Sequence, residues 1–464
     1  MTRLSFVTII YFALASCRSS SDSPDDLARH FMATNQIRGM FVAVVKGDSV
    51  LYQNSFGITN EKTGTVLTNT TCMELGSVSK AFTAEVIYQL QNENLLSLDD
   101  SITKYLPGAP DNWANIKIRH LLTHTSGIQN YLQDPRFKAR EYFIGATDSI
   151  SDHFFRTVST DSMTNMFYSL PVEFIPGTSW AYSNTGYYLL GKIAEAVTGV
   201  TFFDLVKNRV TGPFNMHQTM ANEQALQKGC LTADYFHSDA GIVRVHTLTS
   251  NYAFSAGAWA TTGHDMINYL KAIHRKALPS DMAKFNRRSL LNYGLPFAYE
   301  GGRFYSTYHG NNIMAHNGGT AGFSSSWIHV VDKAMSIIVL MNRQDYAGID
   351  QFAWDVLSYF EPSLKYPTKR LKGGEEKNYS RKVMDIINAL KTNAAYPPGF
   401  SKSLEIFMNS ENGKGMWRWQ FERGFPETAY CVDVESIGQL KAYRYCLALS
   451  GKVEYRMTML VNGK

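Results

Sequence analysis

The sequence of 464 residues has little charge, few cysteines and no apolar segment long enough to span a membrane as a helix. Charged residues make up 18% of the chain, and 45 Lys and Arg against 40 Asp and Glu leave a net charge of only +5. Because no basic tract concentrates this excess, the composition argues against nucleic acid as a partner. Five cysteines are too few for a disulfide scaffold of this length. With 44% hydrophobic residues, the chain should instead build a sizeable globular core of one large domain or two to three ordinary ones.

The first 17 residues resemble a bacterial lipoprotein signal. Arg3 precedes an apolar stretch from Leu4 to Ala15, which is shorter than the roughly 20 residues of a membrane-spanning helix. Leu14-Ala15-Ser16-Cys17 resembles a lipobox, in which Cys17 receives the lipid. We therefore expect a signal peptide at 1–16, a serine-rich tether at 17–29, and an exported protein anchored by lipid to a bacterial membrane, on the periplasmic side or at the cell surface. The alternative is an ordinary secretory signal with a chance cysteine.

Strand patterns occur near both ends of a large region, with helical patterns between them. Residues 39–56 predict a hairpin that turns at Lys46-Gly47-Asp48, and residues 323–331 and 335–342 predict a second hairpin around Asp332-Lys333. Apolar spacing predicts helices at 77–92, 116–123 and 184–198. The expected fold class is therefore α/β (α+β): an antiparallel sheet assembled from both ends of a domain at 30–362, flanked by helices and carrying a helical insert.

A charged segment that contains Pro and Gly predicts a linker at 363–379, followed by a small α+β domain of a helix and a strand meander at 380–464. A two-residue turn at Gly438-Gln439 would place Asp433 opposite Arg444 and Cys431 opposite Cys446. In an oxidising compartment these two cysteines could form a disulfide. Two buried thiols are the equally weighted alternative.

Ser77-Val78-Ser79-Lys80 is the first candidate for chemistry. Residues three apart on a helix share a face, with Cβ atoms about 5–6 Å apart, so Lys80 can reach the Ser77 hydroxyl and accept its proton. The free N–H groups of a helix N-terminus could stabilise an oxyanion. The pattern alone is weak, because Ser101-Ile-Thr-Lys104 matches it as well.

The context of Ser77 resembles the serine β-lactamase and penicillin-binding-protein superfamily, and most closely its class C lactamase, D,D-peptidase, D-aminopeptidase and esterase branch. The resemblance covers about residues 30–345, and its blocks occur in the family's order. The blocks are residues 56–108, 118–131, 173–199, 212–220, 255–270, 316–327 and 339–342. It implies the D,D-peptidase/β-lactamase fold.

The resemblance also implies roles for the residues of the first two motifs. Ser77 would be the acylated nucleophile and Lys80 its base. In Tyr182-Ser183-Asn184, Tyr182 would carry the proton between Ser77 and the leaving group, and Asn184 would hold Lys80 and the substrate amide. Because tyrosine ordinarily has a pKa of about 10, Tyr182 needs a neighbouring cation to act as a base, and Lys80 is the candidate.

The third motif departs from the lactamase pattern. His316-Asn317-Gly318-Gly319 stands where lactamases carry Lys-Thr-Gly, so His316 and Asn317 replace the groups that grip a drug's carboxylate. The resemblance implies that His316 and Gly318 bind substrate, and that the Gly319 and Ser77 N–H groups form the oxyanion hole. A histidine at this position is similar to some D,D-peptidases, D-aminopeptidases and esterases.

The predicted function is therefore an exported serine hydrolase that cleaves amide or ester bonds of D-Ala-type peptides or small esters. The alternatives are a β-lactamase, or a non-catalytic lipoprotein that binds penicillin or senses peptidoglycan. We expect no cofactor and no metal, although His120 and His124 are spaced to share one. The expected partners are a small-molecule or peptide substrate and, through the lipid anchor, a membrane. The loop His124-Thr125-Ser126-Gly127 is expected to be structural, with Gly127 as the stop of a helix.

Overall fold

The architecture is taken from a computed structural model of the chain. It describes residues 6–7, 23–138, 159–232, 235–238, 241–244, 250–275, 299–320, 322–344, 346–367, 370–371, 379–392, 425–437, 440–449 and 452–462. Two compact units are present, one formed by Met1–Leu27 with Tyr346–Lys464 and the other by Ala28–Asp345. The signal predicted at 1–16 lies outside the described residues except for Phe6–Val7, and Cys17 lies outside them altogether.

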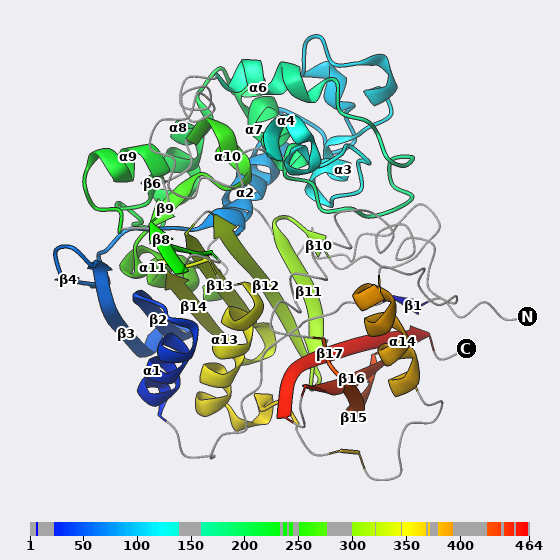
Figure 1. Cartoon of the computed structure of the whole chain (residues 1–464). Coiled ribbons are helices and arrows are strands. Elements are labelled where there is room, and N and C mark those ends of the chain that lie inside the picture. Colours follow the sequence, from blue (N-terminus) through cyan, green and yellow to red (C-terminus); the bar gives the residue numbers. More distant parts are fainter. Residues whose placement is uncertain are drawn as a thin grey trace, which may run out of the picture. The chain divides into compact units, whose positions relative to one another are not determined.

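The unit Ala28–Asp345 contains an eight-stranded antiparallel sheet in the order β10-β11-β12-β13-β14-β2-β3-β4. Its strands come from both ends of the unit, so that the blue strands β2 and β3 lie beside the yellow-green strands in Figure 1. The predicted fold class is confirmed. The strands are β2 (Gly39–Lys46), β3 (Ser49–Asn60), β4 (Thr65–Val66), β10 (Tyr299–Glu300), β11 (Arg303–Tyr308), β12 (Asn311–Thr320), β13 (Phe323–Val330) and β14 (Met335–Met341).

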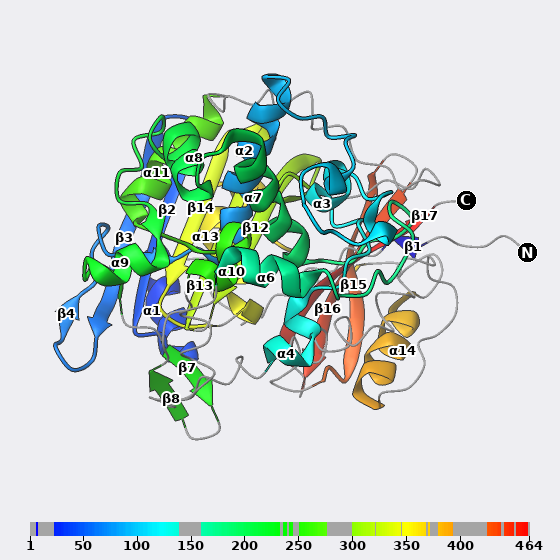
Figure 2. The same cartoon turned by 90° about the horizontal axis from the view of Figure 1, so that it is seen from above.

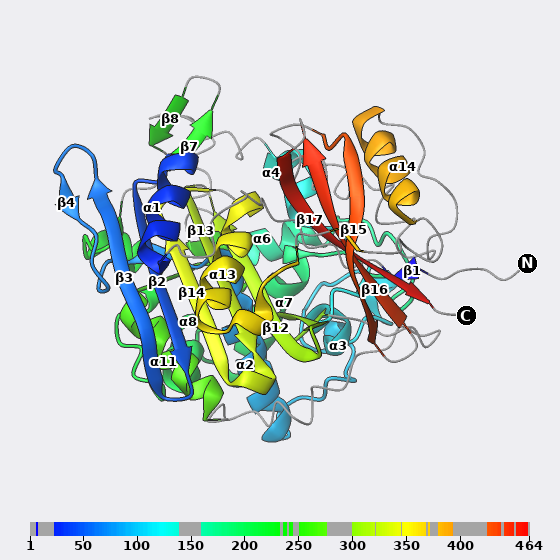
Figure 3. The ribbon, with the colours of Figure 1, turned by 90° about the horizontal axis from the view of Figure 1, so that it is seen from below.

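Both predicted hairpins of this sheet are confirmed, at β2–β3 and β13–β14. Strand β2 is apolar on successive residues and is buried on both faces from Gly39 to Val45, as a strand in the middle of a covered sheet should be. One face joins the main core through Phe41, Ala43 and Val45. On the other side of the sheet, α1 (Pro24–Asn35) runs across β2 and β3, and the Arg29 guanidinium lies 5.7 Å from the centre of the Phe56 ring (Figure 3).

In the sequence, helices lie between the two sets of strands. In space, they gather over one face of the sheet (Figure 2). They are α2 (Lys80–Asn92), α3 (Ile118–Leu122), α4 (Pro135–Lys138), α6 (Thr160–Phe167), α7 (Asn184–Thr198), α8 (Phe202–Val206), α9 (Asn222–Gln227), α10 (Ser250–Ala253) and α11 (Gly263–His274). Two small sheets lie among them. They comprise β5 (Met73–Glu74), β9 (Trp259–Thr261) and β6 (Met220–Ala221), and β7 (Tyr235–Ser238) with β8 (Gly241–Arg244).

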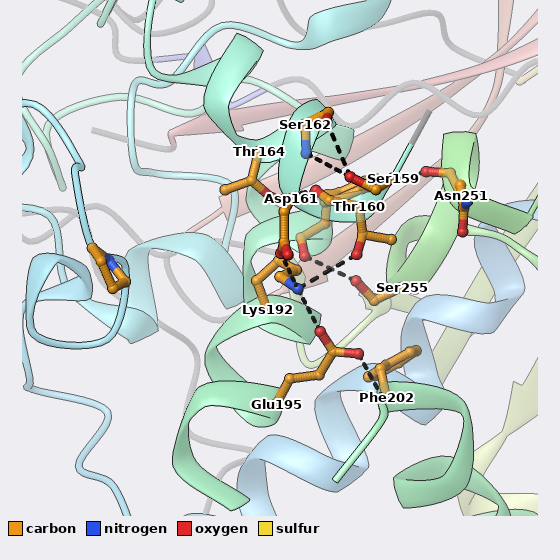
Figure 4. Close-up of polar contacts among 12 residues, drawn as sticks. Ser159, Thr160, Asp161, Ser162, Thr164, Lys192, Glu195, Phe202, Asn251 and Ser255 are labelled. Atoms are coloured by element: carbon orange, nitrogen blue, oxygen red, sulfur yellow. Dashed lines mark hydrogen bonds and ion pairs between the residues drawn. The ribbon is translucent and has the colours of Figure 1, made fainter. Parts of the chain in front are cut away.

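Helix α7 has the bounds that the sequence predicts, because both of its ends carry strong signals. The Ser183 hydroxyl accepts the Gly186 N–H at its start, and Gly199 ends it with a φ of +69°. Midway, the Lys192 ammonium contacts Asp161 at 2.8 Å and Glu195 at 2.6 Å (Figure 4). The second Glu195 oxygen accepts the Phe202 N–H at 2.9 Å, so one ion-pair network joins α6, α7 and the start of α8.

Two histidines, one on α11 and one on β13, contact the same serine hydroxyl on β14. His329 Nδ1 and His274 Nε2 each lie 2.8 Å from Ser336 Oγ, and burial lowers the pKa of His329 to about 3. An unfolded chain binds a proton at this histidine below about pH 6.5, whereas the folded chain does not, so stability falls as the pH drops from 6.5 toward 3.

We expect the variant His329→Gln to weaken this acid sensitivity. The free energy of unfolding should fall less steeply between pH 6.5 and 4, by up to about 1.4 kcal/mol per pH unit. Urea unfolding at several pH values measures the slope, and the exposed His217 gives the control variant His217→Gln. An unchanged slope for His329→Gln would contradict the assignment.

The second unit carries helices α13 (Tyr346–Phe360) and α14 (Tyr379–Thr392) and a four-stranded antiparallel sheet in the order β1-β17-β16-β15. The strands are β1 (Phe6–Val7), β15 (Thr428–Ile437), β16 (Leu440–Leu449) and β17 (Lys452–Asn462). Helix α14 lies beside this sheet (Figure 3), with the Tyr379 and Tyr443 rings 4.9 Å apart. Within the segment predicted as a linker, Tyr366 Oη donates to Tyr445 O and Leu371 N–H donates to Cys431 O.

The predicted register of the β15–β16 hairpin is right near the turn and wrong beyond it. Asp433 lies opposite Arg444, and the two form an ion pair. A bulge at Val432 then shifts the pairing by one residue, so that Cys431 faces Tyr445 instead of Cys446. Both cysteines are buried free thiols. The turn at 438–439 lies outside the described residues.

Within the described ranges, no helix is both long enough and apolar enough to cross a lipid bilayer.

Candidate active site

Ser77 lies in a single 3-10 turn, η1 (Gly76–Ser79), that leads directly into α2. Gly76 has a φ of +52°, a conformation that glycine adopts without a Cβ penalty. The turn is buried except at Ser77, which is partly accessible to solvent. The chain therefore presents one hydroxyl from an otherwise closed segment.

The Lys80 amine is completely buried and lies beside that hydroxyl. Lys80 Nζ is 2.9 Å from Ser77 Oγ, 2.7 Å from Asn184 Oδ1 and 2.7 Å from the carbonyl oxygen of Ala256. Burial lowers the pKa of Lys80 well below its ordinary value of 10.5, because no carboxylate among the described residues contacts the amine to compensate for lost hydration.

This geometry suits a general base. A charged ammonium can donate to all three oxygens, whereas a neutral amine has two N–H groups and one lone pair. With Asn184 and Ala256 accepting the two N–H groups, the lone pair of neutral Lys80 faces the Ser77 hydroxyl. Lys80 can therefore take the serine proton as the nucleophile attacks.

Tyr182 contacts the same hydroxyl from another direction. Its phenol donates to Ser77 Oγ at 2.8 Å, and Lys80 Nζ lies 5.1 Å from the centre of its ring. Tyr182 precedes α7, whose first residue is Asn184, so one helix start supplies two site residues. The predicted residues Ser77, Lys80, Tyr182 and Asn184 thus form one hydrogen-bonded group.

Strand β12 brings Gly318 and Gly319 against the serine turn. A Cβ placed on Gly318 would lie 2.0 Å from Leu75 O and 2.9 Å from Ser77 N, and one on Gly76 would lie 2.6 Å from Gly319 N. The amides of Ser77 and Gly319 therefore lie close together, as two donors to a single oxyanion would have to. The missing side chain of Gly318 thus allows β12 to pack closely against the chain at Leu75 and Ser77.

We expect the variant Gly318→Ala to lose at least about tenfold in acylation rate, because the added methyl must push β12 away from Leu75 and displace the Gly319 amide. The matched control is Gly186→Ala, whose methyl would meet its nearest neighbour at 3.6 Å, an ordinary contact. Active-site labelling and thermal unfolding of both variants measure the effect. Equal labelling rates for both would contradict the required close approach.

His316 lies in the aromatic surroundings of the site and bonds to none of the four hydrogen-bonded residues. Its Nδ1 donates to its neighbour's carbonyl, Asn317 O, which leaves Nε2 to accept the Tyr299 hydroxyl at 3.0 Å. Burial and the nearby Lys80 charge lower the pKa of His316 to about 3, so the ring is neutral at physiological pH. The lysine of the lactamase pattern is thus replaced by an uncharged group with both nitrogens engaged.

His124 holds the segment that carries Tyr182. Its carbonyl accepts the Ala181 N–H at 3.0 Å and its Nδ1 accepts the Ser183 N–H at 3.2 Å, so both neighbours of Tyr182 bond to one residue. Its ring centre lies 4.3 Å from that of Tyr182. His124 also corrects the expected helix stop: α3 ends at Leu122, and His124, with a φ of +57°, is the first left-handed residue after it. Gly127 is left-handed as well, with a φ of +78°, but it lies further along the loop.

The second Ser-x-x-Lys match has a purely structural setting. The Ser101 hydroxyl accepts the Thr103 N–H at the start of a short 3-10 turn. The exposed Lys104 ammonium contacts Asp100 at 3.0 Å. Neither residue contacts the Ser77 group. Among the residues that the structure describes, no cluster of three or more His, Cys, Asp or Glu side chains could hold a metal ion.

Two parts of this site escaped the sequence reasoning. The Ala256 carbonyl is a backbone group, and only its place in the resembling block 255–270 pointed to it. Tyr299, the hydrogen-bond partner of His316, begins the two-residue strand β10 and shows no periodicity or motif.

The chain is similar to known proteins over most of its length. The family model described as Beta-lactamase matches residues 24–358. Penicillin-binding protein 4* of Bacillus subtilis is 26% identical over 341 residues, which is 68% of this chain and 70% of that protein. The D-aminopeptidase of Brucella anthropi is 27% identical over 338 residues, 71% of this chain and 60% of the aminopeptidase.

Solved structures show the same fold. A D-stereospecific amidohydrolase from Streptomyces sp. matches with a TM-score of 0.59 and 26% identity, over 74% of this chain and 99% of its own. The octameric penicillin-binding protein homologue of Pyrococcus abyssi matches with a TM-score of 0.61 and 19% identity, over 95% of this chain and 99% of its own. With its serine turn, buried lysine and tyrosine in one hydrogen-bonded group, the chain belongs to the β-lactamase family of penicillin-binding-protein-like serine hydrolases.

Proposed function

We propose that this protein is an exported serine hydrolase that forms an acyl-enzyme on Ser77 and cleaves amide or ester bonds of D-Ala-type peptides or small esters. The observation that carries the proposal is the convergence on one partly accessible hydroxyl of a buried lysine amine at 2.9 Å and a tyrosine phenol at 2.8 Å. A purely structural serine would not require a buried lysine without a carboxylate partner.

In the proposed reaction, Ser77 Oγ attacks the substrate carbonyl and its proton passes to neutral Lys80. The Ser77 and Gly319 amides stabilise the resulting oxyanion. As the tetrahedral intermediate collapses, Tyr182 donates its phenol proton to the leaving nitrogen or oxygen and regains one from Lys80. Water then attacks the acyl-enzyme, with the same groups moving its proton to Ser77 Oγ, and the acid product leaves.

The substrate class follows from the relatives and from the third motif. The relatives include a D-aminopeptidase, an esterase and a D-stereospecific amidohydrolase. Neutral His316 supplies no cation for the carboxylate of a β-lactam, so a peptidase or esterase activity ranks above a β-lactamase. For the export part of the proposal, the support is the lipobox-like segment alone, and incorporation of labelled palmitate into the wild type but not into Cys17→Ser tests it.

Intact-mass spectrometry tests the proposed hydrolase. The protein is incubated with a panel of D-Ala peptides, p-nitrophenyl esters and β-lactams, and the mass is followed with time. We expect a transient acyl adduct with a D-peptide or ester, located on Ser77 by peptide mapping. An adduct that forms and never decays would favour the penicillin-binding sensor, rapid nitrocefin turnover would favour a β-lactamase, and absence of any adduct would refute the acyl-enzyme.

A further inference from the structure

Two cysteines of the catalytic unit lie side by side near the serine turn. Cys72 immediately precedes β5, and Cys230 follows α9. The Cys72 N–H donates to Cys230 O at 3.0 Å, and the Thr232 N–H donates to Cys72 O at 3.0 Å, which makes a short parallel pairing. Covalent geometry adds about 1.5 Å from N to Cα and about 2.4 Å from O to Cα, so the two cysteine Cα atoms lie within about 7 Å. Disulfides require a separation of this kind.

The side chains also meet. Burial, and after it the neighbouring Cys230 thiol, raise the pKa of the Cys72 thiol. The Cys230 thiol donates to the Ala225 carbonyl at 3.5 Å. Both cysteines pack in one apolar cluster with Met220, Ala225 and Ala260. Both are free thiols in this structure; Cys72 is 1% exposed, whereas Cys230 is partly exposed and is therefore the side on which an oxidant can approach.

We propose that Cys72 and Cys230 are joined as a disulfide by thiol–disulfide exchange with a low-molecular-mass disulfide such as oxidised glutathione. The accessible Cys230 loses its proton to water, and its thiolate attacks the oxidant and expels one thiolate. The Cys72 thiol then attacks Cys230 Sγ in the mixed disulfide, gives its proton to the departing sulfur and expels the second thiol. The protein loses two protons and two electrons, and one oxidant disulfide becomes two thiols.

The disulfide would stabilise the small sheet of β5, β9 and β6, two strands of which lie next to active-site residues in the sequence. Strand β5 pairs with β9, and β9 pairs with β6. Leu75, two residues before Ser77, continues this pairing: its N–H donates to Trp259 O at 2.8 Å. Ala256, which accepts from Lys80, lies just ahead of β9. Linking Cys72 to Cys230 therefore fastens the outer end of the small sheet that supports both the nucleophile and the carbonyl partner of Lys80.

Non-reducing peptide mapping of the full chain tests the proposal. After reduction and then exposure to oxidised glutathione, we expect a linked pair of peptides containing Cys72 and Cys230, a mass loss of about 2 Da and two fewer titratable thiols. Circular dichroism should show a melting temperature roughly 5 °C higher for the oxidised than for the reduced protein. These measurements do not involve Ser77, so their outcome is separate from that of the proposed hydrolase.

Variants supply the controls. Cys230→Ser replaces the accessible partner and should abolish both the linked peptides and the rise in melting temperature. Cys431→Ser with Cys446→Ser is the matched control, because those thiols bond to different carbonyls, Asp433 O and Pro367 O, and this variant should keep the link. Glutathione that stays attached to Cys230, an unchanged thiol count, or a link between Cys431 and Cys446 instead would overturn the proposal.

Discussion

Replacing Ser77 by alanine should abolish labelling by fluorophosphonate and by fluorescent penicillin, and should reduce ester or peptide turnover by on the order of 10⁴-fold or more. The substitution removes one oxygen, the atom on which the Tyr182 phenol and the Lys80 amine converge. Because the rest of the turn is buried and unchanged, the fold should persist. The effect is therefore expected in chemistry and not in thermal stability.

Ser101→Ala is the matched control, since Ser101 also stands three residues before a lysine and begins a 3-10 turn. Its hydroxyl caps that turn, so we expect a small loss of stability and unchanged labelling. The measurement is the rate of fluorescent labelling on a gel, followed by mass mapping of the labelled peptide. Labelling of Ser77→Ala at the wild-type rate would remove Ser77 from the mechanism.

Replacing Lys80 by methionine should slow acylation by about 10³-fold while Ser77 remains in place. Methionine keeps an apolar chain of similar length in the buried site and removes the group that receives the serine proton. It also leaves the Ala256 carbonyl without its lysine donor, at a cost of about 1–3 kcal/mol, so some loss of stability should accompany the kinetic effect.

The pH dependence of the acylation rate separates the loss of the base from the loss of stability. In the wild type, the acylation rate should rise with pH through the lowered pKa of Lys80, because only the neutral amine accepts a proton. In Lys80→Met this rise of the rate with pH, the ascending limb of the pH profile, should disappear. Lys104→Met, which removes the exposed lysine of the second Ser-x-x-Lys match, should keep both the rate and the limb. A Lys80→Met protein that acylates within tenfold of the wild type would show that Tyr182 alone activates the serine.

How far the sequence predicts this site depends on the range of each contact. The Ser77–Lys80 contact follows from a spacing of three residues and holds even though Ser77 lies in a 3-10 turn and not in α2. Tyr182 lies 105 residues from Ser77, and no local pattern joins them. That contact, and those of Asn184 and Gly319, were predictable only through the ordered family motifs.

The errors arise where the backbone departs from its usual local rules. His124 takes a left-handed conformation in which glycine is expected, because its own side chain and carbonyl bond to the Tyr182 segment. The bulge at Val432 moves Cys431 by one position, and nothing in the alternation of β15 and β16 indicates where an extra residue enters. Tyr299 contributes to the site because β10 pairs with β11, which pairs on its other edge with β12, the strand that carries His316.

The pairing of β2 with β14 has a consequence for how the chain folds. Met40 faces Met341, so the middle of the main sheet closes only after about 300 further residues are available. Until then an apolar strand that is buried on both faces in the final structure has no partner on one edge. Such long-range pairing slows folding and exposes a strand edge to aggregation, so the unfinished chain should depend on chaperones while its last strands are being made.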